Sequence, residues 1–348
     1  MTADTTSTAR TGSAQPVPRW VSPAQQGQIR YLNAGDVAAM APSPQQLREA
    51  IIRIFRAKDS KQTVHEPKLT LSIAPGHFFQ SLVGASLDGN RAMMKWASIV
   101  ADNAGRGLPN VTSMIVLNDL QTGQPLAILD GNWITAARTA AMTAVAATYL
   151  ARADSRTIGF IGCGVQAQSH LSSLSAALPS LTHARAYSRT RRSSEAFAEA
   201  ARRAGLTAEV VEDARAAVEG SDLVVTSVPA QPGLQPFLDP AWVGPGGFVA
   251  AVDLGRHWLP GSLRRSFDLL ATDDHRQSEA LGAAGKLPFP GPFDADLGDL
   301  ILGRHPGRRQ AEERVLFLFP GMVLGDLAIA AMIYDMACEK EIGLKLPR

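Results

Sequence analysis

A glycine-rich loop between an apolar strand and a helix is the feature that most constrains this sequence. The strand Thr157–Ile161 is followed by a loop, Gly162–Ala167, that reads G-x-G-x-x-A. In this motif the first glycine allows a tight turn, and the second lets backbone amides approach a pyrophosphate at the helix N-terminus. The loop therefore predicts a dinucleotide site, the alternative being a packing turn in an α/β sheet. The residues expected at the cofactor are Gly162, Gly164, Val165, Gln166 and Ala167.

Strands and helices alternate around this loop. After the loop, strands are expected at His183–Tyr187, Glu209–Val211, Leu223–Thr226 and Gly247–Val252. The helices expected in this region are Gln166–Leu178, Ser193–Ala204 and Ala214–Glu219. Because such alternation places strands in parallel with crossover helices on the faces, the sequence predicts an α/β protein with a doubly wound parallel sheet.

The chain before Asp154 reads instead as an α+β region. Short strands are expected at Lys68–Ser72 and Met114–Leu117. The helix expected at Ile134–Ala151 is apolar on nearly every side, so it belongs between two domains. A strongly apolar last helix, Gly321–Ile342, is expected to fold back on this first part. A length of 348 residues agrees with about two domains.

Composition and charge exclude several classes of protein. The formal net charge of +2 is too balanced for a nucleic-acid or anionic-membrane binder, and no run of about 18 apolar residues is present to span a membrane. Two cysteines, Cys163 and Cys338, fit a cytoplasmic protein without a disulfide framework. The seven histidines are scattered, and no Walker, H-E-x-x-H or G-x-S-x-G motif occurs, so we expect no metal site. His170, inside the first crossover helix, is interpreted as structural.

The end of the second strand of the alternating region indicates which nicotinamide cofactor fits. An NAD site usually places an Asp or Glu there, on the ribose 2′-hydroxyl. This chain instead reads Ser188-Arg189-Thr190-Arg191-Arg192. Arginines and small hydroxyls can bind a 2′-phosphate through charge-assisted hydrogen bonds, so NADPH is favoured while NADH stays possible. The alternative is a solvated arginine cluster at a helix start.

Two cations lie in apolar surroundings in the first part of the chain. Lys95 falls within Met93-Met94-Lys95-Trp96, and Arg138 is the lone charge on the alanine-rich helix. Buried charges need partners, and Asp or Glu neighbours could supply them for structural reasons alone. The functional alternative is that both cations face a cleft and hold a substrate carboxylate beside its reacting carbon.

Further motifs follow one another along the whole chain. They are Lys95-Trp96, Asp102-Asn103, Gly107-Leu108-Pro109, Val116-Leu117-Asn118-Asp119, Arg138-Thr139-Ala140-Ala141, the Gly162–Ala167 loop, Ala295-Asp296-Leu297-Gly298-Asp299, Pro306-Gly307-Arg308 and Gly321-Met322 before Asp326. With these pieces the sequence resembles the ornithine cyclodeaminase/μ-crystallin family from Tyr31 to Pro347. The segments Tyr31-Leu32-Asn33, Glu66-Pro67-Lys68 and Phe319-Pro320-Gly321-Met322 look nearest to its siderophore-pathway branch, which makes N-(2-amino-2-carboxyethyl)-glutamate.

The resemblance implies a homodimer in which a Rossmann domain is inserted into a discontinuous first domain. Residues 1–28, which are rich in Thr, Ser, Ala, Gln and Pro, are expected from this composition to be a flexible tail. Residues 29–153 and 321–348 would form the substrate-binding and dimerisation domain, and residues 154–320 the nucleotide domain. The family includes cyclodeaminases, alanine dehydrogenases and ketimine reductases, so the resemblance implies chemistry at the Cα–N bond of an α-amino or imino acid.

The resemblance also assigns site residues. Lys95 and Arg138 would bind the substrate carboxylate and polarise the imine, with Lys68 as a weaker carboxylate ligand. Ser188, Arg189 and Thr190 match the pocket of NADPH-using members. The remaining residues assigned to the cofactor are Arg192, Ser227, Val228, Gly321 and Met322.

Asp253 marks a departure from the family pattern. Cyclodeaminases carry an acid/base Asp in a G-G-D-type loop, whereas this chain reads Ala250-Ala251-Val252-Asp253-Leu254-Gly255. Asp253 aligns with that Asp only if one residue is deleted just after it. Asp253 is therefore a hypothetical acid/base group, the alternative being a strand-end carboxylate bonded to the backbone. If it does not act, Lys95 or a water would have to deliver the proton.

These observations predict an NAD(P)H-dependent oxidoreductase of the imine-reductase or amino-acid-dehydrogenase type, acting on a small amino or imino acid. Two alternatives stay open. One is a cyclodeaminase or amino-acid-condensing synthase that recycles its cofactor. The other is an NADPH-dependent ligand-binding protein of the μ-crystallin type without turnover.

Overall fold

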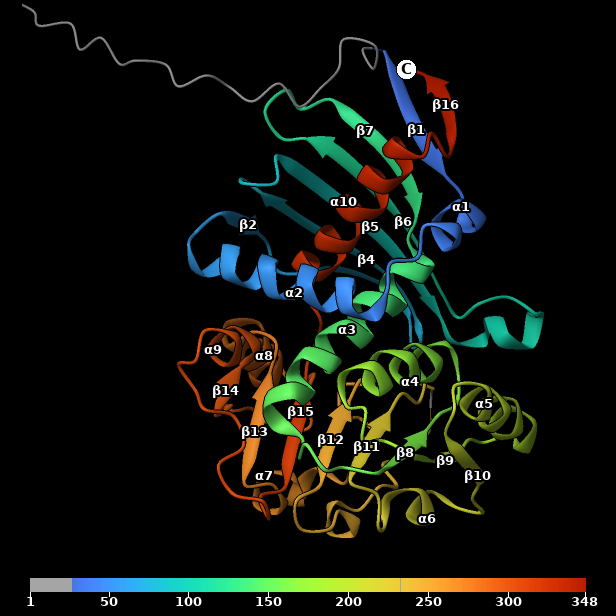
Figure 1. Ribbon diagram of the computed structural model, residues 1–348, viewed down its shortest axis with the longest axis vertical. Helices are drawn as coiled ribbons and strands as arrows, with labels where there is room; N and C mark the ends of the chain where they lie inside the picture. The colour runs from blue at the N-terminus through green and yellow to red at the C-terminus, as the bar shows by residue number, and fades with distance from the viewer. Residues whose placement is uncertain (1–26, 232) are drawn as a thin grey trace, which may run out of the picture.

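The computed structural model describes residues 27–231 and 233–348. It contains two eight-stranded sheets, drawn one above the other in Figure 1, with helices between them. The tail expected at residues 1–28 lies outside the described residues except for Gly27 and Gln28, and Gln28 already belongs to a strand. In the described part of the chain, no helix has the length and apolarity needed to cross a membrane.

The first sheet joins strands from both ends of the chain. Its order is β16 (Leu344–Pro347), β1 (Gln28–Leu32), β7 (Pro125–Asp130), β6 (Val111–Asp119), β5 (Arg91–Val100), β4 (His77–Ser86) and β2 (Thr63–His65), with β3 (Leu69–Ala74) also paired to β4. The β1–β7 pair is parallel and the other pairs are antiparallel. As in every β-strand, the side chains of successive residues face opposite sides of the sheet.

The second sheet is wholly parallel. Its order is β10 (Thr207–Val210), β9 (His183–Tyr187), β8 (Thr157–Ile161), β11 (Leu223–Thr226), β12 (Phe248–Ala251), β15 (Val315–Leu318), β13 (Leu269–Thr272) and β14 (Ala295–Asp296). The strand order reverses at β8, which pairs with β9 on one side and β11 on the other. Ligands of such sheets bind beyond the carboxyl ends of the strands at this switch point. The predicted α/β class with a doubly wound parallel sheet is confirmed.

Helices cover the parallel sheet and separate the two sheets. Those of the middle of the chain are α4 (Val165–Ala177), α5 (Arg191–Arg203), α6 (Ala214–Val218), α7 (Leu263–Ser266), α8 (His275–Ala283) and α9 (Leu297–Ile301), with short 3₁₀ turns at Pro240–Trp242 and Pro260–Ser262. The others are α1 (Ala34–Ala39), α2 (Pro44–Asp59), α3 (Asn132–Leu150) and α10 (Val323–Glu339), and a 3₁₀ helix spans Ala101–Arg106.

The alanine-rich helix α3 is the centre of the packing between the sheets (Figure 1). It contacts α2, α4, α9 and α10, and most of its side chains are buried. Small side chains allow this because they let neighbouring helices approach on several sides at once. Helix α10 lies across β4 and β5 of the first sheet.

The last helix is shorter than the sequence predicted. It runs from Val323 to Glu339 and not from Gly321 to Ile342. Gly321 and Glu341 have left-handed backbones, with φ of +76° and +56°, so neither can belong to a right-handed helix. After Glu341 the chain forms β16, an unpredicted strand that pairs antiparallel with β1. The proposed domain boundaries at residues 154 and 321 stay a prediction.

Candidate functional site

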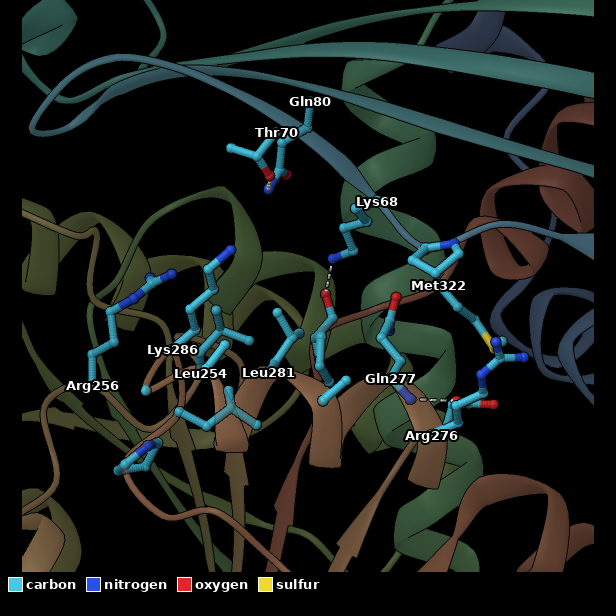
Figure 2. A pocket seen from close by; sticks show the side chains of 18 of the residues that line it. Lys68, Thr70, Gln80, Leu254, Arg256, Arg276, Gln277, Leu281, Lys286 and Met322 are labelled. Carbon is cyan, nitrogen blue, oxygen red and sulfur yellow. Dashed lines mark hydrogen bonds between the residues drawn. The ribbon is translucent and has the colours of Figure 1, made fainter.

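A cavity of about 1060 Å³ lies between strands β3 and β4 of the first sheet and the loops that follow β12 and β13 of the second. Figure 2 shows its polar residues: Thr70 and Gln80 point down from strands β3 and β4, and Lys68 from the loop before β3. On the opposite side lie Arg256 and Lys286 from loops and Gln277 from helix α8. Thr70 and Gln80 are register partners and share a hydrogen bond of 3.3 Å, so they present one polar surface. The size suits a small-molecule site, for which about 300–1,000 Å³ is usual.

A buried ion cluster links the first sheet to α3 and α10. The Nζ atom of Lys95 lies 2.7 Å from Oδ1 of Asp326, and the Nε atom of Arg138 lies 3.3 Å from the same oxygen. All three side chains are buried, Asp326 completely. Lys95 and Arg138 therefore come together as the sequence predicted, but in this structure they share a carboxylate of the chain and do not line the cavity.

Lys68 joins this cluster to the cavity. Its Nζ donates to the carbonyl oxygen of Pro320, and its side chain lines the cavity. Burial, together with the nearby Arg138 and Lys95, lowers the pKa of Lys68 to about 7. Burial and Arg138 likewise lower the pKa of Lys95 to about 8, although Asp326 opposes this shift. Two lysines whose pKa values are lowered by burial and by the nearby Arg138 would have their charged forms stabilised by an added anion.

Asp273 is a member of this cluster that the sequence analysis did not single out. It directly follows β13, is completely buried, and neither of its carboxylate oxygens accepts a hydrogen bond from another side chain in the described chain. Burial raises its pKa to about 6, against the opposing effect of Lys68. The signal was its place at the carboxyl end of a parallel strand, where ligands of such sheets bind. With Asp326 it leaves the cluster with two carboxylates for three cations.

The glycine loop has the geometry that its sequence predicts. Gly162 has φ of +86°, and a Cβ there would lie 2.9 Å from the carbonyl oxygen of Ser227, so the turn requires glycine. Gly164 begins α4, and the position of its missing Cβ faces open space, which leaves the backbone accessible to a ligand. Val165 follows with 71% of its surface exposed, whereas Ala167 is completely buried between helix and strand. These residues fit a pyrophosphate at the N-terminus of α4.

The arginine-rich segment lies beside this loop at the end of β9. Thr190 caps α5, and the guanidinium of Arg189 donates to Oε1 of Gln231 over 2.8 Å. Arg191 already pairs with Glu195 and Glu212, whereas Arg189 and Arg192 are exposed and make no ion pair with described residues. Ser227 donates to the Gly162 carbonyl and so ties the β11 loop, with Val228, to the glycine loop. The guanidinium groups of Arg189 and Arg192 are thus available to a phosphate group.

Gly321 and Met322 lie at the far end of the cofactor edge, where β15 leads into α10. A Cβ on Gly321 would collide with the guanidinium of Arg138, so glycine is required there by a neighbour as well as by its backbone. Met322 is buried and lines the cavity. Gly321 therefore contacts the cation cluster and Met322 the cavity, and the assignment of both to the cofactor stays a prediction.

Asp253 is oriented toward its own loop. Its Oδ1 accepts hydrogen bonds from Thr226 Oγ1 at 3.0 Å and from the amide of Gly255 at 3.2 Å, and its Oδ2 lies 3.0 Å from Nδ1 of His257. Asp253 does not line the cavity, but Leu254 and Arg256 in the same loop do. The geometry resembles the strand-end alternative, and the acid/base role stays a prediction.

Two other groups have structural explanations. His170 is buried, with Nε2 3.0 Å from Thr143 Oγ1 and Nδ1 2.7 Å from the Gln166 carbonyl, and burial lowers its pKa to about 4. His275, Asp296 and Asp299 lie close enough to hold a metal ion, but Asp299 pairs with Arg304 and Asp296 caps α9. Both arrangements are ordinary structural networks.

Comparison with known proteins agrees with this geometry. Residues 33–341 match the model of the ornithine cyclodeaminase/mu-crystallin family. An N-((2S)-2-amino-2-carboxyethyl)-L-glutamate dehydrogenase of Staphylococcus aureus is 25% identical, with 92% of this chain and 98% of the relative covered.

Solved structures agree over the same length. A Thermococcus litoralis Δ1-pyrroline-2-carboxylate reductase in complex with NADH and L-proline superposes with a TM-score of 0.83 at 26% identity, covering 91% of this chain and all of that one. An archaeal alanine dehydrogenase dimer with bound NAD has a TM-score of 0.79 at 25% identity, covering 92% of this chain and 99% of that one. The chain belongs to the ornithine cyclodeaminase/mu-crystallin family.

Proposed function

We propose that this protein is a nicotinamide-dependent oxidoreductase that reduces the C=N bond of an α-imino acid, or oxidises the corresponding α-amino acid. The observation that carries the proposal is the cluster of the half-buried Lys68 with the buried Lys95 and Arg138, beside a cavity at the carboxyl edge of a dinucleotide-type sheet. An excess of buried cations there suits a substrate carboxylate. The dehydrogenase and the reductase to which the chain is similar support the same reaction.

The chain's own residues would bind and orient the substrate. Lys68, whose side chain lines the cavity, would bind the substrate carboxylate directly. Arg138 and Lys95 lie behind Lys68 and would add positive charge that balances the charge of the carboxylate. The bound nicotinamide would supply the hydride to Cα, and the imine nitrogen takes one proton, which turns C=N into CH–NH. Asp253 is the proposed source of this proton and would have to deliver it through a water, because its carboxylate faces its own loop and does not line the cavity; Lys95 or a water acting alone is the alternative.

The reaction is tested by incubating the purified protein with NADPH, a panel of cyclic ketimines, and α-keto acids mixed with amines, while NADPH absorbance and product mass are followed. We expect one NADPH to be consumed for each amino acid formed. Ornithine and lysine are run alongside. Conversion of ornithine to proline without net NADPH change would contradict the proposal in favour of a cyclodeaminase. NADPH binding without any turnover would contradict it in favour of a ligand-binding protein.

NADPH is the proposed preferred cofactor. Support comes from Arg189 and Arg192, which are exposed at the end of β9, and from Ser188 and Thr190 beside them. These side chains can donate to a 2′-phosphate and offer no carboxylate to a 2′-hydroxyl.

The free cysteines, Cys163 and Cys338, support a reducing compartment, and we place the protein in the cytoplasm on that ground.

Substituting Arg189→Gln is expected to weaken NADPH binding about tenfold, because a charge-assisted hydrogen bond to the 2′-phosphate is lost. NADH binding should change little. Both affinities are measured by calorimetric titration. Arg203→Gln, an exposed arginine at the other end of α5, is the matched control and should leave both unchanged. Equal affinity of the wild type for NADH and NADPH would contradict the assignment of Arg189 to the 2′-phosphate.

The depressed pKa of Lys68 predicts how substrate capture depends on pH. A lysine is charged below its pKa, so the attraction for a carboxylate is present below about pH 7 and is lost as pH rises through that value. We expect kcat/KM for an imino acid to fall above about pH 7. In Lys68→Arg, whose side chain stays charged, the fall should begin near pH 8, where Lys95 titrates. The same substrate is used for both proteins, so its own titration cancels. Superimposable profiles would contradict the role of Lys68.

We also propose that two copies of the chain associate through the outer face of the first sheet. The register places Leu69, Leu71, Phe79, Val83, Met94, Trp96 and Met114 on the face opposite Thr70 and Gln80. Most are well exposed, Leu69 by 70%, and Trp96 stacks on Phe79 with ring centroids 5.4 Å apart. A continuous apolar face of this kind usually marks an interface. The solved relative described as a dimer supports a homodimer.

Met94→Glu is expected to convert the dimer to a monomer, because it places a charge in the centre of the apolar face. Sedimentation velocity at micromolar concentration measures this. Leu234→Glu changes a residue of equal exposure in the loop after β11 and should remain dimeric. A wild-type monomer, or dissociation of both variants alike, would contradict the assigned face.

A further inference from the structure

The cavity holds more positive charge than one carboxylate requires. Besides Lys68, it is lined by Arg256, Arg276 and Lys286. None of these three makes a side-chain hydrogen bond or ion pair with the residues described at 27–231 and 233–348. Of the acidic lining residues, Asp274 is already paired with Lys58 at 2.6 Å, which leaves Glu66. Arg256, Arg276 and Lys286 are exposed, and no side chain in the described part of the chain forms a hydrogen bond or ion pair with them, so their charge is available to a ligand.

Two of these cations, Arg256 and Lys286, lie at one end of the cavity, away from Lys68. In Figure 2 their side chains rise toward the hydrogen-bonded pair of Thr70 and Gln80 on the opposite wall. Arg256 and Lys286 thus supply cationic donors, and Thr70 and Gln80 supply neutral polar atoms. Such a set can hold an anionic oxygen group by charge-assisted hydrogen bonds.

Arg256 and Lys286 lie in loops whose conformations are fixed by hydrogen bonds. The Arg256 loop is bonded to Asp253 through the Gly255 amide and the His257 ring, and it ends on Trp258, which is completely buried. Lys286 follows α8 in a turn closed by its own amide, which donates to the Leu281 carbonyl over 2.9 Å. Positions fixed in this way reduce the entropy cost of binding. This also gives Asp253 a positioning function that is independent of proton transfer.

We propose that Arg256 and Lys286 form a distal subsite for a second carboxylate of the substrate, so that the preferred substrate is an α-imino or amino acid with an acidic side chain. The inference rests on the proposed function, because the α-carboxylate is assigned to the Lys68 end. A cavity of about 1060 Å³ has room for a substrate that spans both ends. The acidic side chain would replace water around two exposed cations that form no ion pair with a side chain of residues 27–231 or 233–348.

The test compares reductive amination of 2-oxoglutarate with that of 2-oxohexanoate, which has an uncharged side chain of similar length, using NADPH and methylamine. We expect kcat/KM for the diacid to exceed that for the neutral acid at least about tenfold in the wild type. Arg256→Gln and Lys286→Gln should each lower this ratio about tenfold, and Arg256→Lys should restore part of it. Lys345→Gln, on β16 at the opposite edge of the first sheet, is the control and should keep the wild-type ratio.

A second measurement separates this inference from the proposed reaction. Binding of 2-oxoglutarate and 2-oxohexanoate is measured by calorimetry in the presence of NADPH, with no amine. Turnover of both acids at equal kcat/KM would overturn the distal subsite and leave the oxidoreductase function standing. Tighter binding of the diacid that depends on Arg256 and Lys286, but without NADPH consumption in the first test, would support the subsite and contradict the function. Equal binding of both acids in every variant would also overturn the subsite.

Discussion

The shared carboxylate of Asp326 is the interaction on which the site depends. It joins a lysine from the central strand β5 and an arginine from α3 to the helix that returns from the end of the chain. Two cations buried in this way would be strongly unfavourable without an anion, because desolvation of each costs several kcal/mol. Asp326 therefore stabilises the packing of α10 on the first sheet and holds Lys95 and Arg138 in fixed positions.

Charge compensation within the cluster of Lys68, Lys95, Arg138, Asp273 and Asp326 is incomplete, and this suits the cluster to binding an anionic ligand. Asp326 leaves its second oxygen without a hydrogen bond from described residues, and Asp273 is buried with no hydrogen-bond donor from another described side chain. The lowered pKa values of Lys68 and Lys95 and the raised pKa of Asp273 have the same main cause, which is burial that disfavours the charged form of each group. A substrate carboxylate would complete the charge balance of the cluster. The binding energy gained in this way can then hold the reacting carbon in a fixed orientation.

Local patterns predicted much of this molecule, and distant contacts explain what was not predicted. The glycine loop was recognisable because strand, turn and helix lie within a few residues of one another, and the lone charge of Arg138 was visible against its alanine-rich helix. The partner of Lys95 was not, because Asp326 lies 231 residues away and only the fold brings them together. Asp273 was missed because β13 has four residues and carries no motif. The strand β16 was missed because pairing with β1, rather than its own sequence, forms it.

The central claim is that hydride reaches the carbon that bears both the nitrogen and the carboxylate. The most direct measurement uses NADPH deuterated at the transferable position of the nicotinamide, a cyclic α-imino acid, and magnetic resonance and mass analysis of the amino acid formed. The account predicts one deuterium per product molecule, located at Cα, with unlabelled NADPH in heavy water giving none at that carbon. Product that carries no deuterium from the cofactor, or that takes its Cα hydrogen from solvent, would contradict it.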